Sequence, residues 1–237
     1  MPTHFVDTAG PFELPTGWHE VSTAQFCALD RLRLATVEAR AGYFAGRPIQ
    51  VNGLVADALA WMLRAPDTTG GLAYPLDLGQ ETYLQVESIR ALLAKQPLHE
   101  CYGLVYAAFK GRYDHWGSKE FDQARSYVYA ERCLKFAITD TYPAVAHCLA
   151  ELERLARKYA RLSEPDTTEA GRRAREAGSE RLAVYEYLPT AKWFSQQYGL
   201  TLEQAMQTSW ETVAVHLLLA RDEAEIADQL HKNSSHE

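Results

Sequence analysis

The residues best suited to chemistry are two histidines and two cysteines that lie in two close pairs. His99 and Cys101 are two positions apart, and His147 and Cys148 are adjacent. Positions i and i+1, or i and i+2, face different sides of an α-helix, so neither pair can chelate a metal from a regular helix. A zinc site would need both pairs to meet, with Cys133 as a further ligand. We therefore expect no metal, and interpret the cysteines as reduced thiols packed among apolar neighbours.

A second candidate for chemistry is the polar loop 110–118, in which Asp114 and His115 precede Trp116. An Asp–His dyad could serve in acid–base catalysis. The same residues suit a turn that the tryptophan anchors, and we favour the turn. An enzyme centred on His99, Asp114 and His115 remains an alternative. The chain contains no phosphate-binding glycine motif and no GxSxG or HExxH pattern, so we expect no cofactor.

The composition limits the classes of partner. The 237 residues are 47% hydrophobic and 23% charged, with a net charge of -7. This balance predicts a globular chain that binds neither nucleic acid nor an anionic membrane. Five arginines between 161 and 181 are matched by five acidic residues, which indicates a solvated, salt-bridged helix. Residues 1–15 lack a secretory signal, and no run of about 18 apolar residues occurs, so we expect a cytoplasmic protein.

Apolar residues recur with helical spacing along most of the chain. The first predicted helix begins at a cap, Ser22 or Thr23, and Thr139 or Thr141 is predicted to cap the helix from Tyr142 to Leu162. The other predicted helices cover 54–63, 80–94, 98–109, 118–138, 182–198, 201–207, 209–219 and 222–230. The sum is an all-α, multi-helix bundle of about nine or ten helices.

Breaks in this pattern divide the chain into four parts. Residues 1–21, rich in glycine and proline, predict an extended arm or a small β-hairpin. Residues 22–162 form the main helical domain. Residues 163–180 form a polar linker or a solvated helix, because they contain almost no large apolar side chain. Residues 181–237 form a small C-terminal helical unit.

Aromatic side chains are the best candidates for partner binding, since they dominate interface hot spots. Tyr113 and Trp116 lie on the polar loop, where an interface and simple packing are equally plausible. Three further tryptophans complete the predicted set: Trp18, Trp193 and Trp210.

Three segments together resemble a known class of protein. They are LPTGWHEVSTAQFCAL at 14–29, LDLGQETYLQVESI at 76–89 and YGLTLEQAMQTSWETVAVHLLLA at 198–220. In each of the first two segments a glycine is followed by a serine or threonine and then by a glutamine. With the third they resemble small helical proteins encoded among phage tail-morphogenesis genes, of the type found in Bacteroidetes phages. The C-terminal segment is similar to tail assembly chaperones, which bind the tape-measure protein.

The resemblance implies a non-enzymatic protein that acts in tail assembly or tail structure by protein–protein binding. It implies tape-measure or other tail proteins as partners, allows a homo-oligomer, and places the chain in the host cytoplasm or on the virion. A helical interaction or regulatory module outside phage, and an unrecognised enzyme, are the two alternatives.

Overall fold

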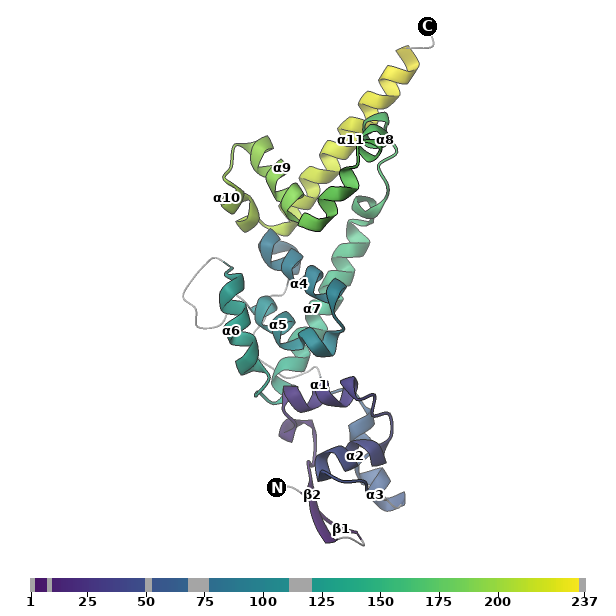
Figure 1. Ribbon diagram of the computed structural model, residues 1–237, viewed down its shortest axis with the longest axis vertical. Helices are drawn as coiled ribbons and strands as arrows, with labels where there is room; N and C mark the ends of the chain where they lie inside the picture. Colours follow the sequence, from purple (N-terminus) through teal and green to yellow (C-terminus); the bar gives the residue numbers. More distant parts are fainter. Residues whose placement is uncertain (1–2, 8–9, 50–52, 68–76, 111–120, 235–237) are drawn as a thin grey trace. The chain divides into compact units, whose positions relative to one another are not determined.

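The computed structural model describes residues 3–7, 10–49, 53–67, 77–110 and 121–234 (Figure 1). Strands β1 (Thr3–Asp7) and β2 (Gly10–Leu14) form an antiparallel hairpin in which Phe5 lies opposite Phe12. Nearly all the remaining elements of the described chain are helical. The predicted all-α, multi-helix fold with a short extended arm is confirmed. None of the described helices is both long and apolar enough to cross a membrane.

The chain forms two compact units, each assembled from separate stretches of sequence. Unit 1 contains Met1–Tyr74, Leu92–His115 and Asp122–Cys148, and unit 2 contains Pro75–Ala91, Trp116–Phe121 and Leu149–Glu237. The division predicted from the sequence follows breaks in composition, whereas these units follow contacts in space. Two helices, α4 and α7, therefore contribute residues to both units.

Unit 1 is built around α5, whose side chains Tyr102, Tyr106 and Phe109 are almost fully buried. A smaller cluster of Leu14, Val37 and Met62 lies where the hairpin meets α2. The elements of this unit are the 3₁₀ helices η1 (Trp18–Glu20) and η2 (Ala60–Leu63) and helices α1 (Thr23–Arg31), α2 (Val37–Ala45), α3 (Gly53–Ala58), α5 (Leu98–Lys110), α6 (Gln123–Cys133) and the first half of α7 (Ile138–Lys158).

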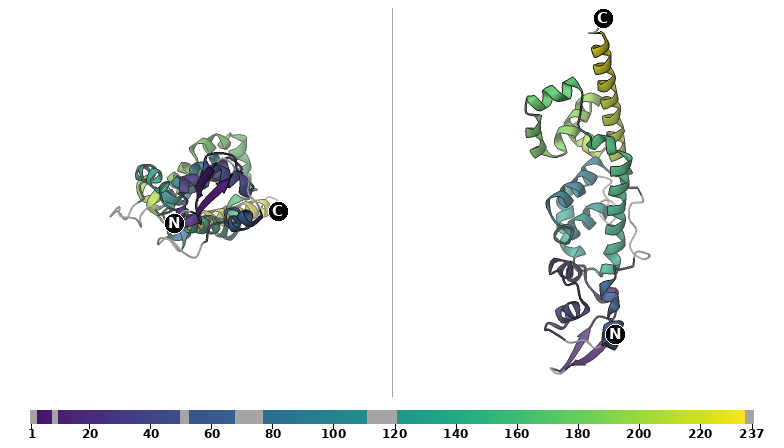
Figure 2. Two further views of the ribbon diagram at one scale, coloured as in Figure 1. Left: turned by 90° about the horizontal axis from the view of Figure 1, so that it is seen from below. Right: turned by 90° about the vertical axis from the view of Figure 1, so that its right-hand side faces the viewer.

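Unit 2 is organised around the long helix α11. This helix is the long yellow one in Figure 2. The rings of Phe194 and Tyr198 in α9 pack against the ring of His216 in α11, at centroid distances of 5.6 and 4.8 Å. The elements are η3 (Leu78–Gln80), α4 (Tyr83–Lys95), the rest of α7, η4 (Ala160–Ser163), α8 (Glu169–Glu176), η5 (Ser179–Tyr185), α9 (Leu188–Tyr198), α10 (Leu202–Gln207) and α11 (Trp210–Ser234).

One β-bridge joins the starts of two helices in unit 1. The N–H of Thr23, the first residue of α1, donates to the carbonyl of Phe136 at 2.8 Å. The N–H of Ile138, the first residue of α7, donates to the carbonyl of Val21 at 2.8 Å. Ser22 and Ala137 are the antiparallel bridge partners. The bridge thus satisfies one N–H that each helix would otherwise leave without an acceptor.

Unit 2 contains a second β-bridge of the same design. Tyr83, the first residue of α4, donates to the carbonyl of Thr208, and Trp210, the first residue of α11, donates to the carbonyl of Glu81, both at 2.8 Å. Thr82 and Ser209 are the bridge partners. A 3₁₀ turn precedes α4 just as one precedes α1. The two units therefore start their helices with the same local structure.

Three helices begin just after a serine or threonine that is followed three residues later by a glutamine. The hydroxyl of Ser22 accepts from the N–H of Gln25 while the side chain of Gln25 accepts from the N–H of Ser22, which is a capping box. Thr201 and Gln204 form the predicted capping box of α10. Thr82 accepts from the N–H of Gln85 in the same way at the start of α4.

Two predicted helix starts are wrong. Helix α7 begins at Ile138, ahead of the predicted caps Thr139 and Thr141, because the bridge carbonyl of Val21 already accepts the first N–H. Helix α6 begins after Asp122, whose carboxylate caps it. The predicted start at residue 118 lies outside the described residues.

Two predicted helix ends are also wrong. The apolar and charged residues from Phe26 to Arg40 predict a single helix up to the break at Gly42. Helix α1 instead ends at Arg31, and Arg33 turns the chain with φ of 54° before Thr36 caps α2. Helix α11 runs without a break through Asp222, where a new helix was predicted. The polar stretch 163–180 contains the largely exposed helix α8, consistent with the solvated-helix alternative.

The contact between Thr23 and Thr141 tests how much unit 1 depends on the first β-bridge. Their hydroxyl oxygens lie 2.8 Å apart and both side chains are fully buried. We expect Thr23→Val to lower the free energy of unfolding by about 1–3 kcal/mol, because it leaves the Thr141 hydroxyl buried with one partner fewer. In urea unfolding, Thr23→Val/Thr141→Val should cost less than the sum of the single variants. Strict additivity would contradict the coupling.

Candidate functional site

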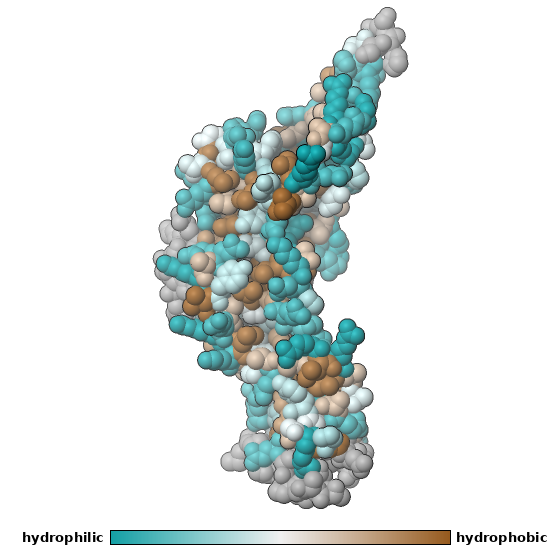
Figure 3. Space-filling model, viewed as in Figure 1, coloured by the Kyte–Doolittle hydropathy of each residue, from teal (hydrophilic) through white to brown (hydrophobic). Residues whose placement is uncertain are grey.

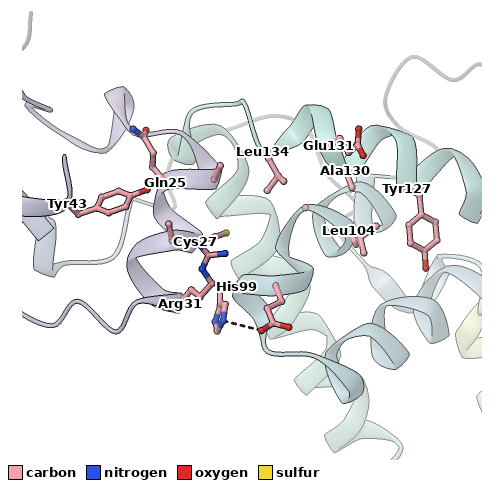
Figure 4. A pocket seen from close by; sticks show the side chains of 14 residues that line it. Gln25, Cys27, Arg31, Tyr43, His99, Leu104, Tyr127, Ala130, Glu131 and Leu134 are labelled. Atoms are coloured by element: carbon pink, nitrogen blue, oxygen red, sulfur yellow. Dashed lines mark ion pairs between the residues drawn. The ribbon is translucent and has the colours of Figure 1, made fainter. Parts of the chain in front are cut away.

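A groove in unit 1 has a volume of about 660 Å³ (Figure 4). Helices α1, α5 and α6 line it, and Tyr43 of α2 contributes a ring. A Cβ at Gly103 would lie 2.9 Å from the carbonyl oxygen of Ala130, so glycine is needed for α5 and α6 to approach this closely. The lining mixes small residues such as Ala28 with polar groups, among them Arg31.

The groove contains His99, one of the residues predicted to be capable of chemistry. Its Nδ1 lies 3.0 Å from Oδ2 of Asp30, and its Nε2 lies 3.8 Å from Oε1 of Glu100, the pair drawn in Figure 4. The Asp30 side chain is 66% exposed, so water screens the interaction between His99 and Asp30. An Asp–His pair of this kind can orient an imidazole, but acyl transfer would also need an activated nucleophile.

The sulfur in the groove, that of Cys27, is a poor nucleophile. Burial, followed by the charge of Asp30, raises the pKa of the Cys27 thiol to about 12. The reactive species of cysteine is the thiolate, which is scarce at neutral pH when the pKa is this high. The proposed constellation with Asp114 and His115 lies outside the described residues. The groove therefore offers a binding surface more readily than a catalytic centre.

The structure brings no metal ligands together among the residues it describes. Cys101, Cys133 and Cys148 are fully buried and are not joined in disulfides within the described part of the chain, which confirms their predicted packing as small apolar residues. His147 lies against the ring of Phe109 at a centroid distance of 6.0 Å. These positions explain the cysteines and His147 by packing.

Two of the five predicted partner-binding aromatics are core residues. Trp18 is 8% exposed, packs against Trp61 at 5.0 Å, and donates its Nε1–H to the carbonyl of Arg64. Trp210 is 6% exposed and donates its Nε1–H to a carboxylate oxygen of Glu87 at 2.7 Å. Because their polar atoms are satisfied inside the chain, both tryptophans serve packing.

The other three predicted aromatics are less informative. Trp193 is half-buried on α9, with its ring 6.5 Å from that of Phe194. Tyr113 and Trp116 lie outside the described residues.

The exposed apolar surface is concentrated in unit 2. Of the 14 large apolar residues that the structure exposes, ten belong to unit 2. Brown surface over α9 and α10 is visible in Figure 3. Monomeric proteins seldom expose contiguous apolar patches unless these bind something. The ten exposed residues in unit 2 are Leu182, Val184, Tyr185, Leu188, Tyr198, Leu202, Val215, Leu219, Ile226 and Leu230.

Four of these residues form a stripe along α11, which we call the α11 stripe: Val215, Leu219, Ile226 and Leu230. At about 100° per residue they fall within about 60° of one another around the helix axis. Their exposed fractions are 48, 53, 57 and 64%. The spacing of four, seven and four residues was available in the sequence, but the helix break predicted at 222 concealed it.

The opposite face of α11 packs against the rest of unit 2 and includes two charged residues, Arg221 and Asp228. The guanidinium of Arg221 is largely buried and donates to the carbonyls of Arg161, Glu164 and Pro165. Asp228 accepts from the N–H of Glu169 at the start of α8, and its pKa is lowered, chiefly by Lys232 and then by this N–H. Val213 and Ala214, earlier in α11, are buried on the same side, so apolar and charged contacts together hold α11 with its stripe outward.

The start of α11 is held by Glu211. Its carboxylate accepts from Nζ of Lys158, from the hydroxyl of Tyr159 and from Nε2 of Gln80. The hydrogen bond from Lys158, followed by that from Tyr159, lowers the pKa of Glu211 below its ordinary value of 4.5. This cluster ties the second half of α7 and the 3₁₀ turn η3 to the second β-bridge.

Comparison with protein-family models, with curated proteins and with solved structures found no match to this chain.

The pKa of Cys27 makes a testable prediction about thiol reactivity. At pH 8 we expect iodoacetamide to alkylate Cys27 in the folded chain at least ~100-fold more slowly than in the urea-unfolded chain, because burial suppresses the thiolate. Peptide mass spectrometry over time gives the rate at each cysteine. Rapid modification of Cys27 in the folded state would reopen the case for a nucleophile in the groove.

The lowered pKa of Glu211 predicts a dependence of stability on pH. A carboxyl whose pKa is lower in the folded state stabilises fully above its unfolded pKa, and this stabilisation is lost as the pH falls through the folded pKa. We expect Glu211→Gln to cost about 1–2 kcal/mol at pH 7 and much less at pH 3. Urea unfolding at both values measures this. The exposed Glu223→Gln is the control and should change little; an equal cost at both pH values would refute the assignment.

Proposed function

We propose that this chain works by binding other proteins, and that unit 2 provides the binding surface. The observation that carries the proposal is the α11 stripe, with its four half-exposed apolar side chains on one face of a helix that is held by charges on the other. An exposed amphipathic helix is a standard element of protein recognition. The groove of unit 1 is a second surface of suitable size.

We further propose that the binding serves the assembly or structure of a phage tail. Three segments, 14–29, 76–89 and 198–220, resemble phage tail-morphogenesis proteins, and all three occupy related places in the fold. The first carries η1 and the start of α1, and the second carries η3 and the start of α4. The third carries the end of the second β-bridge and the start of α11. The segments that carry the resemblance thus contain the 3₁₀ turns and the helix starts that recur in the two units.

In this proposal the partners are tail proteins such as the tape-measure protein, and the site of action is the host cytoplasm or the virion. A catalytic role has less support, because Cys27 is protonated and the pair formed by His99 and Asp30 is open to solvent. A regulatory module would use the same surface, so the two non-enzymatic functions must be separated by experiment.

Removal of the gene from the phage genome tests the proposal. We expect lysates without the protein to contain filled heads that lack normal tails, and a plasmid copy of the gene to restore them. Electron microscopy of negatively stained particles counts tailed and tail-less heads. A plasmid copy carrying Leu219→Ser/Ile226→Ser should restore far fewer tails, because it removes the centre of the α11 stripe.

A copy carrying Leu182→Ser/Val184→Ser is the matched control, since it removes two exposed aliphatic side chains elsewhere in unit 2. It should restore tails as the natural sequence does. Normal tails in the absence of the gene would contradict the tail function, and a genome without virion genes around it would favour the regulatory alternative.

A further inference from the structure

The α11 stripe has the geometry of a helix-binding seam. Val215 and Leu230 are 15 residues apart, a length of about 22 Å along the helix. The intervals between Val215, Leu219, Asp222 and Ile226 are four, three and four residues, which is the alternation of a coiled-coil seam with one acidic position. A straight α-helix laid along this line would cover all four apolar residues.

The charges next to the stripe indicate the kind of helix that fits. Asp222 interrupts the stripe, and Glu223 and Glu225 lie on its two sides. Asp222 and Glu225 share the guanidinium of Arg161, whereas Glu223 forms no ion pair within the described part of the chain. Arg221, the basic residue of this stretch, points to the opposite face. Three carboxylates beside the one guanidinium of Arg161 leave the border of the stripe net acidic.

The charge of the whole unit has the same sign. Unit 2 contains 19 acidic and 13 basic residues, a net charge of -6, whereas unit 1 contains 12 and 11, a net charge of -1. Two copies of unit 2 brought together along their stripes would repel each other, and a cationic partner would be attracted. The charge thus disfavours a second copy of this chain as the occupant.

We infer that the α11 stripe binds an amphipathic partner helix with an apolar seam and basic flanks. The seam covers Leu219 and Ile226, and lysine or arginine on its flanks faces Asp222 and Glu223. This inference rests on the proposed function only in that both require unit 2 to bind protein; it adds the chemistry of the partner.

Two synthetic helices distinguish this occupant from others. Each has 21 residues with leucine at the a and d positions; the basic probe has lysine at e and g, and the acidic probe has glutamate there. Fluorescence anisotropy of labelled probes with the full-length protein measures affinity at 50 and 300 mM NaCl. We expect the basic probe to bind at least ~10-fold more tightly than the acidic one at 50 mM, and the difference to shrink at 300 mM.

Two double variants test whether the basic probe binds at the α11 stripe. Leu219→Ser/Ile226→Ser should weaken the basic probe by at least ~10-fold, because it removes two apolar side chains from the centre of the seam. Leu182→Ser/Val184→Ser, which removes two exposed side chains of η5, should change its affinity by less than about twofold. All four positions are about half exposed or more, so circular dichroism and thermal melting should show folded proteins.

Several results would overturn the inference. Equal binding of both probes, no binding of either, or an equal loss in the control variant would each exclude a basic helix on the stripe. A dimer in sedimentation equilibrium that Leu219→Ser/Ile226→Ser dissociates would make a second copy the occupant. Failure of the tail experiment with success of the probes would instead refute the phage function alone.

Discussion

The interaction on which both units depend is the pairing of two helix starts through a single β-bridge. A helix leaves its first N–H groups without acceptors inside the helix, and burying such a group unpaired is costly. Here the first N–H of α1 and of α7 are satisfied by chain segments that precede the other helix, and α4 and α11 are paired in the same way. Each bridge thus fixes where two helices begin, and so constrains which side chains face inward.

The two bridges are built from related stretches of chain. Ser22 with Gln25 and Thr82 with Gln85 occupy the same positions relative to a 3₁₀ turn, a cap and a bridge. At the other half of each bridge the residues differ more, since Ile138 in unit 1 corresponds to Trp210 in unit 2. The recurrence describes one local structure used twice, with different side chains carried into the two cores.

The sequence predicted those parts of the fold that local chemistry determines. The capping box of Thr201 and Gln204, the αL glycine at Gly199 and the hydroxyl cap of α1 follow from short-range patterns. The start of α7 does not follow from such a pattern, because its first N–H donates to the carbonyl of Val21, more than a hundred residues away in the chain. Helix caps that depend on such distant acceptors leave no signal at the cap itself.

The features of the candidate site also depend on contacts between residues that are far apart in the sequence. Their aromatic character predicted that Trp18 and Trp210 bind a partner. Their N–H groups instead donate to acceptors inside the chain, and both rings are buried. The groove of unit 1 depends on the approach of α5 to α6 at Gly103, which only the assembled helices reveal. The stripe on α11 was present in the spacing of the sequence, yet the cluster of charges after Leu219 resembled a helix start.

The orientation of α11 follows from its first turns, where Trp210, Val213 and Ala214 are buried. Burying a large apolar side chain contributes about 1.5–3 kcal/mol, whereas an exposed ion pair contributes about 0–1 kcal/mol. Turning Leu219 and Ile226 inward would rotate Val213 and Ala214 out of the core, so the orientation that buries the first turns of α11 leaves the stripe in water. Leaving the apolar face in water forgoes about 1 kcal/mol for each half-exposed residue. A partner that covers the stripe recovers that free energy on binding.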